Sequence, residues 1–260
     1  MILFKKDIVM DFSFYQYLFA FFGAFLGGFI DAIIGGGGLV TLPLILGLGV
    51  PPALGVATNK LQGAMGMISS LLVVRKNIDF KKMFFGVIIT ATFAALGGLT
   101  LISINSNALK PVVAIILILV FLYTVFKKNI GETQGKARMK LITFLIIFGM
   151  IIGFYDGFIG PGTGSFWIFA FVSLLGFDIR QASINTKLLN AASNIASLVF
   201  FILHYEVLYK LGITMGIGAI IGANLGARVL LKVNIKIIKI LFFVIVFSTL
   251  VKVCYDYFFI

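Results

Sequence analysis

Long apolar stretches alternate with short polar connections along the whole of this 260-residue chain. Eight of the stretches hold about 20 residues, enough for a helix to cross a hydrocarbon layer about 30 Å thick. The pattern therefore predicts an all-α polytopic membrane protein with about eight long transmembrane helices. The stretches cover residues 14–34, 53–74, 83–102, 109–127, 141–159, 181–203, 208–230 and 237–258.

Two further apolar stretches, 36–50 and 163–177, hold only about 15 residues each and adjoin runs rich in glycine. A helix of that length falls short of spanning a bilayer. We expect two short half-helices or re-entrant segments, in which a helix is interrupted inside the membrane.

The glycine-rich motif occurs twice. GFIDAIIGGGGL at 28–39 aligns without a gap with GFYDGFIGPGTG at 153–164, which places Asp31 opposite Asp156. An aspartate in an apolar run therefore recurs together with the glycines that break the run, as expected of a duplicated membrane protein.

A second pair of motifs extends the duplication. ATNKL at 57–61 aligns with INTKL at 184–188, so that Lys60 corresponds to Lys187. We therefore divide the chain into two homologous repeats. The divisions are an N-terminal tail at 1–12, a first membrane repeat at 13–128, a basic cytoplasmic linker at 129–140 and a second membrane repeat at 141–260.

The charges of the connections bear on the orientation of the repeats. The connection 75–82 is strongly basic, whereas its counterpart 204–210 is nearly balanced. Because basic connections remain in the cytoplasm, the repeats are predicted to be inverted relative to each other. Inversion requires the chain to cross the membrane an odd number of times between these two connections. The four long stretches between them give four crossings, and the number becomes five only if 163–177 crosses as well. Eight full spans with re-entrant short segments are the alternative.

Composition agrees with a membrane location and excludes other classes. Apolar residues make up 61% of the chain, against about 45–50% in soluble domains. The net charge of +12 lies in the connections, so it indicates the cytoplasmic side of a bilayer rather than binding to nucleic acid. With a single cysteine, Cys254, and no cluster of metal-ligating residues, we expect no metal and no cofactor. No GxxxxGK[ST] motif is present, so we expect no direct drive by ATP within this chain.

Glycine also recurs at every fourth position in two later stretches. Small residues at this spacing allow two helices to pack closely. We therefore predict that these glycines pack helices together rather than bind a ligand. They are Gly149, Gly153 and Gly157 in one stretch and Gly218, Gly222 and Gly226 in the other.

Four charged residues lie inside predicted spans: Asp31, Lys60, Asp156 and Lys187. A charge near the centre of a bilayer costs about 2.5–3.5 kcal/mol on insertion scales, so it usually faces a partner or water within the protein. We interpret the four residues as parts of a transport pathway. Two salt bridges that only hold helices together are the alternative.

The glycines that break the apolar stretches favour an anion site. Backbone groups freed at membrane depth must be satisfied by protein or by a water-filled cavity, and amides at the N-terminus of a half-helix bind anions. Tight turns between two helices are the alternative. The predicted backbone donors are Gly36 and Gly37 in the first repeat and Gly162 and Thr163 in the second.

Lysine and asparagine side chains complete the predicted site, because lysine offers a compact positive charge with three donors. Helical spacing places Lys187, Asn190, Asn194 and Ser197 on one face. The predicted substrate-binding side chains are Lys60, Lys187, Asn59, Asn185, Asn190 and Asn194.

Asp31 and Asp156 are candidates for proton coupling. Burial favours a protonated carboxyl group, whereas a nearby lysine favours the carboxylate. Protonation of these residues would therefore respond to the state of the site.

At these motifs the sequence resembles the TauE/SafE family of anion transporters, over nearly the whole chain. The resemblance is carried by GFIDAIIGGGGLVTLP, ATNKLQ, FYDGFIGPGTGSF, NTKLLNAASNIASL and GANLGAR. It implies a bacterial-type inner-membrane permease for sulfur-containing oxyanions, sulfonates or small carboxylates. Many family members carry a small residue where Asp31 and Asp156 stand, so the resemblance assigns these aspartates no role.

The sequence thus predicts a secondary transporter that moves a small anion across the cell membrane by alternating access, with proton coupling and homo-oligomerisation left open. Its partners are the anion and the lipid bilayer. Two other classes remain. One is an anion channel that uses the same charges, and the other, with less support, is an intramembrane enzyme in which Asp31 and Asp156 share a proton.

Overall fold

The computed structural model describes residues 10–104 and 135–232, and every regular element in these ranges is a helix. The predicted spans 109–127 and 237–258 lie outside the described residues, as do residues 1–9 of the predicted tail, 129–134 of the predicted linker, and Cys254. The described elements are α1 (Phe14–Ile34), α2 (Gly38–Gly47), α3 (Pro52–Val74), the 3-10 turn η1 (Arg75–Asn77), α4 (Phe80–Ser103), α6 (Leu141–Phe158), α7 (Thr163–Leu175), α8 (Ile179–His204) and α9 (Tyr209–Lys232).

Several helices begin where the local sequence supplies a cap. Ser13 precedes α1 and its hydroxyl accepts the backbone N–H of Gln16 at 3.3 Å, while the Gln16 side chain accepts the N–H of Ser13 at 2.7 Å. Asp79 and Asp178 accept backbone N–H groups at the starts of α4 and α8. Such caps satisfy amides that have no partner within the helix.

Five of the described helices, α1, α4, α6, α8 and α9, are long and apolar enough to cross a membrane. The helix α3 has 23 residues but carries Asn59, Lys60 and Gln62 in its apolar run. The prediction of an all-α polytopic membrane protein is confirmed for the described residues, while the total of eight long helices stays a prediction.

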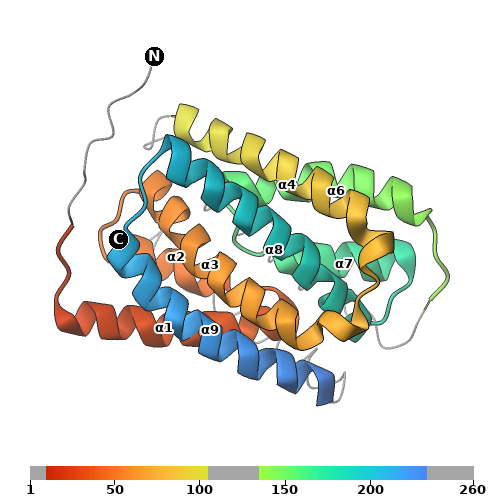
Figure 1. Cartoon of the computed structure of the whole chain (residues 1–260), viewed down its shortest axis with the longest axis horizontal. Coiled ribbons are helices and arrows are strands. Elements are labelled where there is room, and N and C mark those ends of the chain that lie inside the picture. The colour runs from red at the N-terminus through yellow and green to blue at the C-terminus, as the bar shows by residue number, and fades with distance from the viewer. Residues whose placement is uncertain (1–9, 105–134, 233–260) are drawn as a thin grey trace, which may run out of the picture.

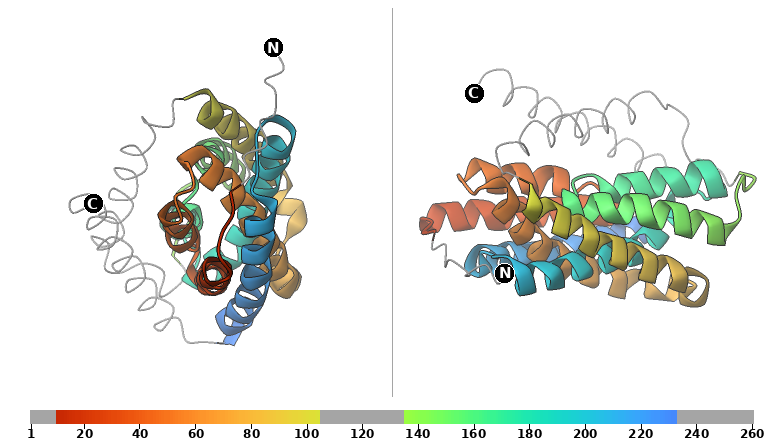
Figure 2. Two further views of the ribbon diagram at one scale, coloured as in Figure 1. Left: turned by 90° about the vertical axis from the view of Figure 1, so that its left-hand side faces the viewer. Right: turned by 90° about the horizontal axis from the view of Figure 1, so that it is seen from above.

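The long helices form two pairs at opposite edges, with α3 and α8 between them (Figure 1). Along one edge α1 packs against α9, and along the other α4 packs against α6. In the centre α3 contacts α8 and α9, and α8 contacts α4. Seen from above, the short helices α2 and α7 lie together on one face of this arrangement (Figure 2).

The first short helix runs back along the helix before it. Gly23 of α1 faces Leu44 of α2, and Gly27 faces Thr41, so the residue numbers rise on one helix as they fall on the other. A hydrophobic cluster then joins the start of α1 to the residues that follow α2. The α1–α2 hairpin therefore ends near the end of the bundle at which it begins.

The second short helix does the same. The ring centres of Phe144 in α6 and Phe171 in α7 lie 4.9 Å apart. The backbone N–H of Gly135, ahead of α6, donates to the carbonyl of Gly176, which follows α7, at 2.8 Å. The α6–α7 hairpin thus returns to its starting end.

This hairpin bears on the number of membrane crossings that the sequence predicts between the connections 75–82 and 204–210. That count treated 141–159 and 163–177 as separate crossings, whereas the two segments together return to one end. The two segments together therefore leave the parity of that number unchanged, whether or not each of them crosses fully. The inverted orientation of the two predicted repeats stays a prediction.

The regularly spaced glycines lie where helices approach most closely. A Cβ on Gly218, Gly222 or Gly226 of α9 would overlap backbone atoms of α1. A Cβ on Gly153 or Gly157 of α6 would overlap backbone atoms of α4. The prediction that these glycines pack helices is confirmed.

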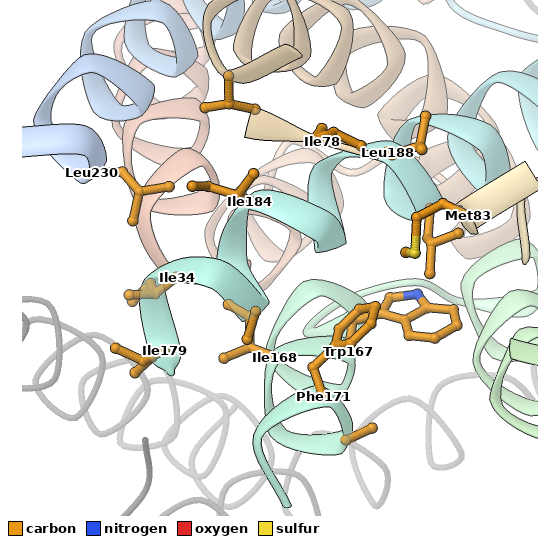
Figure 3. Packing of buried hydrophobic residues seen from close by; sticks show 14 of the residues in the cluster. Ile34, Ile78, Met83, Trp167, Ile168, Phe171, Ile179, Ile184, Leu188 and Leu230 are labelled. Atoms are coloured by element: carbon orange, nitrogen blue, oxygen red, sulfur yellow. The ribbon is translucent and has the colours of Figure 1, made fainter. Parts of the chain in front are cut away.

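The largest hydrophobic cluster lies at one end of the bundle (Figure 3). Trp167 and Phe171 of α7 point into it. Ile78 from the α3–α4 connection, Met83 from the first turn of α4 and Leu230 from the end of α9 complete it. The cluster therefore fixes α7 against the helix ends that surround it.

Basic residues gather at this same end, which lies at the right of Figure 1. Among the described residues, the only acidic ones at this end are Asp79 and Asp178, whereas the opposite end carries Asp11, Glu206 and Lys210. Basic connections stay in the cytoplasm, so we expect this end to face it. The basic residues there are Arg75, Lys76, Lys81, Lys82, Lys136, Arg138, Lys140, Arg180, Arg228 and Lys232.

The glycine contacts predict a cost for a single added methyl group. Gly157→Ala should lower the free energy of unfolding by about 1–3 kcal/mol, because its Cβ would push α6 away from α4. Gly47→Ala is the matched control, since nothing lies within 4 Å of a Cβ there. Thermal unfolding in detergent, followed by the fluorescence of the buried Trp167, measures both variants. Equal melting temperatures would contradict the close approach.

The charge asymmetry predicts which end is reached from outside the cell. In a Cys254→Ser background, Lys210→Cys should react with a membrane-impermeant thiol reagent in intact cells, because its end of the bundle is not the basic one. Arg138→Cys should react only after the cells are permeabilised. The reverse labelling pattern would overturn the orientation.

Candidate functional site

The two helix breaks cross each other. Gly35, which ends α1, has φ 74°, and Gly160 and Gly162, between α6 and α7, have φ 93° and 82°. Glycine adopts these angles without the penalty that a side chain brings. A Cβ on Gly35 would overlap the backbone of Gly164, and the N–H of Ser165 donates to the Gly35 carbonyl at 2.8 Å. The two breaks therefore hydrogen-bond to each other, so part of the backbone that each interruption frees finds a partner in the other break.

A cavity of about 40 Å³ lies beside this crossing, with room for roughly three water molecules. Its wall is built from both predicted repeats, and much of it is glycine. Apart from Asp31, no polar or charged side chain in the wall is more than 8% exposed. The polar and charged side chains of the wall are those of Asp31, Thr41, Asn59, Lys60, Gln62, Asp156, Thr163, Asn190 and Asn194.

Lys60 and Asp156 form an ion pair in this wall, with 2.9 Å between Nζ and Oδ1 and side chains that are 2% and 3% exposed. Lys60 comes from α3 in the first repeat and Asp156 from the end of α6 in the second. Gly160 leaves the space that they need, because a Cβ there would lie 2.8 Å from Lys60 Nζ. The pair therefore links the two predicted repeats at the cavity.

Two neutral donors also bind the Asp156 carboxylate. The Thr163 hydroxyl donates to Oδ1 at 2.8 Å, and the Asn194 amide donates to Oδ2 at 3.2 Å. Four helices, α3, α6, α7 and α8, thus meet at one carboxylate. Loss of Lys60 would leave a buried negative charge with neutral donors only.

Lys187, the counterpart of Lys60, has a different environment. Its ammonium donates to the backbone carbonyl of Asp31 at 3.0 Å and to the Ser183 hydroxyl at 3.2 Å, and it does not line the cavity. The Asp31 carboxylate accepts the N–H of Gly37 at 2.9 Å. It therefore occupies the position at the start of α2 where a helix favours a negative charge. Lys187 and Asp31 both hold the first break in place.

An amide network forms a further part of the wall. Gln62 donates to Asn59 Oδ1 at 2.8 Å and to the Thr41 hydroxyl at 3.1 Å, and Thr41 donates to Asn59 Oδ1 at 2.7 Å. Since the oxygen of Asn59 accepts both bonds, this residue offers N–H donors to the cavity. Gln62 and Thr41 were not predicted as site residues, although Gln62 lies one turn from Asn59 and Thr41 is the only hydroxyl residue of α2.

Nine of the twelve predicted site residues line the cavity, and Gly36, Asn185 and Lys187 do not. Asn185 donates to the carbonyl of Gln181, one turn earlier in α8, at 2.8 Å. The Gly36 carbonyl accepts the N–H of Leu39 at 3.0 Å. This geometry gives these three residues no direct contact with a molecule in the cavity.

The wall of the cavity combines hydrogen-bond donors with the carboxylates of Asp31 and Asp156. One ammonium and several amide and hydroxyl donors converge on it, and such donors bind oxyanions. The described part of the chain holds no group of three or more His, Cys, Asp or Glu residues that could bind a metal ion. Asp31 and Asp156 bind different partners, so the shared proton of the enzyme alternative has no support here.

Known proteins are similar in sequence to this chain over most of its length. The family model described as sulfite exporter TauE/SafE matches residues 20–253. The probable membrane transporter protein YfcA of Escherichia coli (strain K12) is 40% identical over 185 residues, which cover 70% of this chain and 69% of YfcA. The probable membrane transporter protein ORF9 of Sinorhizobium sp is 38% identical over 196 residues, 75% of each chain. No solved structure gives a significant match.

The buried ion pair predicts strong coupling between its two members. Lys60→Met and Asp156→Asn should each lower the free energy of unfolding by about 3–5 kcal/mol, because each leaves one charge buried without its partner. The double variant should lose much less than the sum of the two. Thermal unfolding followed by Trp167 fluorescence completes the double-mutant cycle. Additive losses would show that the two charges do not depend on each other.

Proposed function

The chain belongs to the TauE/SafE family of membrane transporters, and we propose that it is a secondary transporter that carries a small anion across the cell membrane. The observation that carries this proposal is Lys60, a buried lysine in the wall of a cavity beside two crossed helix breaks. A lysine in the interior of a membrane protein marks an ion or substrate pathway more often than a simple structural contact. The inner membrane of a bacterial-type cell is the proposed location.

The donors and the size of the cavity support a sulfur-containing oxyanion, a sulfonate or a small carboxylate as the substrate. Lys60, Asn59, Asn190 and Asn194 all reach the wall, so an anionic head with several oxygens finds a donor on more than one side. The volume of about 40 Å³ fits one such head. A longer substrate requires the cavity to open.

The arrangement of helices supports alternating access by two inverted repeats. In the predicted repeats, α6 corresponds to α1 and α9 corresponds to α4. The packing of α1 against α9 is therefore equivalent to the packing of α6 against α4. The hairpins α1–α2 and α6–α7 enter from opposite ends of the bundle, and their breaks cross beside the cavity. Rocking of one repeat against the other would expose the cavity first at one end and then at the other.

A carrier is favoured over a channel, the second candidate, because the polar wall of the cavity is buried. The ion pair and the crossed breaks form part of that buried wall. A channel needs a continuous path with binding weak enough for rapid release. Flux that does not saturate and does not respond to any coupling gradient would favour the channel.

Transport by the purified protein in proteoliposomes tests the proposal. Labelled sulfite, thiosulfate, sulfoacetate, methanesulfonate and simple carboxylates are offered in turn. Wild-type protein should give saturable flux for at least one sulfur oxyanion or sulfonate. Lys60→Gln should lower that flux about 30-fold or more, as expected when one partner of a buried charge pair is removed.

Lys81→Gln is the matched control, because Lys81 is exposed at the basic end of α4. It should transport as well as the wild type. Each variant is reconstituted only from its folded fraction, isolated by size exclusion. Equal flux in Lys60→Gln and wild type would remove Lys60 from the site, and the absence of flux for every anion would contradict the proposed function.

A further inference from the structure

The four charges in the interior of the described bundle, Asp31, Lys60, Asp156 and Lys187, cancel. Lys60 is paired with Asp156, and Lys187 lies close enough to Asp31 for the two charges to interact. An anion that enters the cavity therefore adds a negative charge to a neutral group. A negative charge in the membrane interior is costly unless a positive charge compensates it. Lys60 supplies that charge only if Asp156 no longer needs it.

We propose that the substrate anion and the Asp156 carboxylate compete for Lys60, and that Asp156 releases Lys60 by taking up a proton, so that one proton moves with each anion. This inference rests on the proposed transport function. It selects one of the two candidate aspartates as the coupling residue, and it makes the ion pair the point at which the anion and the proton are linked.

The partners of Asp156 tolerate its protonation. The Thr163 hydroxyl that donates to Asp156 also lies 2.6 Å from the carbonyl of Gly160. The Asn194 amide that donates to Asp156 also donates to the carbonyl of Asn190 at 2.8 Å. Each donor thus keeps an acceptor when the carboxylate becomes neutral. The cost of leaving a buried donor unsatisfied is avoided.

Asp31 differs in this respect. Its carboxylate accepts a hydrogen bond from the backbone N–H of Gly37. A backbone amide is only a donor and cannot turn away, so the negative charge of Asp31 stabilises the start of α2. We therefore assign Asp31 to the support of the first break rather than to proton coupling.

Within residues 10–104 and 135–232, few ionisable groups surround Asp156. Lys60 faces it from α3, Asp31 lies within electrostatic range on α1, and the Tyr155 phenol lies beside it on α6. On α8, Lys187 is held by the Asp31 carbonyl. The helix α7 carries no ionisable side chain, and α4 carries Lys81 and Lys82 only at its basic end. Lys60 is therefore the positive charge that Asp156 releases.

The exchange balances in charge and in protons. On the side to which the cavity is open, a proton from water binds the Asp156 carboxylate, and the anion takes its place beside Lys60. When the cavity opens to the other side, the anion leaves, Asp156 returns its proton to water, and the Lys60–Asp156 pair forms again. A monovalent anion then moves without net charge, and a divalent anion moves with one net negative charge.

Methanesulfonate and thiosulfate are the probes, because both keep their charge near neutral pH, so any proton that moves is carried by the protein. Proteoliposomes that contain wild-type protein and a pH-sensitive dye report protons and labelled anion together. We expect one proton per anion for each probe. A membrane potential should not drive methanesulfonate but should drive thiosulfate, whereas an inward proton gradient should drive both.

Exchange of labelled for unlabelled anion, measured with no gradient, separates the two hypotheses. If neither probe exchanges in the wild type, the proposed function fails for sulfur anions and the inference falls with it. If a probe exchanges but moves no proton, the transporter stands and the inference is overturned. These wild-type measurements do not depend on the stability of any variant.

Asp156→Asn resembles the protonated carboxyl group and tests the residue itself. It should retain anion exchange, lose accumulation driven by a proton gradient, and bind anion about tenfold or more tightly, because the anion no longer breaks a charge-assisted hydrogen bond. The rise in its melting temperature with added thiosulfate should exceed that of the wild type. A purely structural ion pair predicts neither change.

Two matched variants complete the design. Asp31→Asn should keep one proton per anion in the flux that it retains, and Asp11→Asn, at an exposed position before α1, should behave as the wild type. Loss of proton movement in Asp31→Asn together with its retention in Asp156→Asn would overturn the assignment.

Discussion

A lysine and an aspartate that are both buried in a membrane-spanning bundle must compensate each other, and the Lys60–Asp156 pair imposes this requirement on its surroundings. The pair joins α3 to α6, which lie in different predicted repeats. It also needs space at Gly160 and hydrogen bonds from Thr163 and Asn194. Four helices are thereby held around one carboxylate, and the cavity lies where they meet.

Glycine allows this arrangement in two distinct ways. At the breaks, Gly35 and Gly160 adopt positive φ angles, and Gly35 packs against the second break. Part of the backbone that the interruptions free therefore finds hydrogen-bond partners within the protein. Along α9 and α6, glycines such as Gly222 and Gly157 let neighbouring backbones approach closely. The same residue type thus opens the helices at the site and ties the long helices together at the edges.

The two charged pairs of the recurring motif have different environments. Lys187 donates to the backbone at the end of α1, while the Asp31 carboxylate binds the start of α2. Both groups support a helix break. Lys60 and Asp156, by contrast, lie in the cavity wall and bind each other through their charges. In the transport cycle that we propose, the first pair supports the frame and the second exchanges with the substrate.

Much of the fold follows from local sequence. The stretches 14–34, 53–74 and 181–203 agree closely with α1, α3 and α8, because apolar backbone in a membrane must form helices and polar caps and glycines end them. The short helices were also predicted, but not their return along the preceding helix. That return depends on packing of side chains such as Phe144 and Phe171, which are distant in sequence.

The candidate site shows the same division. The sequence by itself determined that Asp31, Lys60, Asp156 and Lys187 lie inside helices, because charges in long apolar runs are conspicuous wherever they occur. Only the tertiary structure decided that Lys60 reaches the cavity and Lys187 does not. The two lysines occupy equivalent motifs, so no local pattern distinguishes them. Their roles depend on which helix of the other repeat packs beside each one, and that contact exists only in the folded protein.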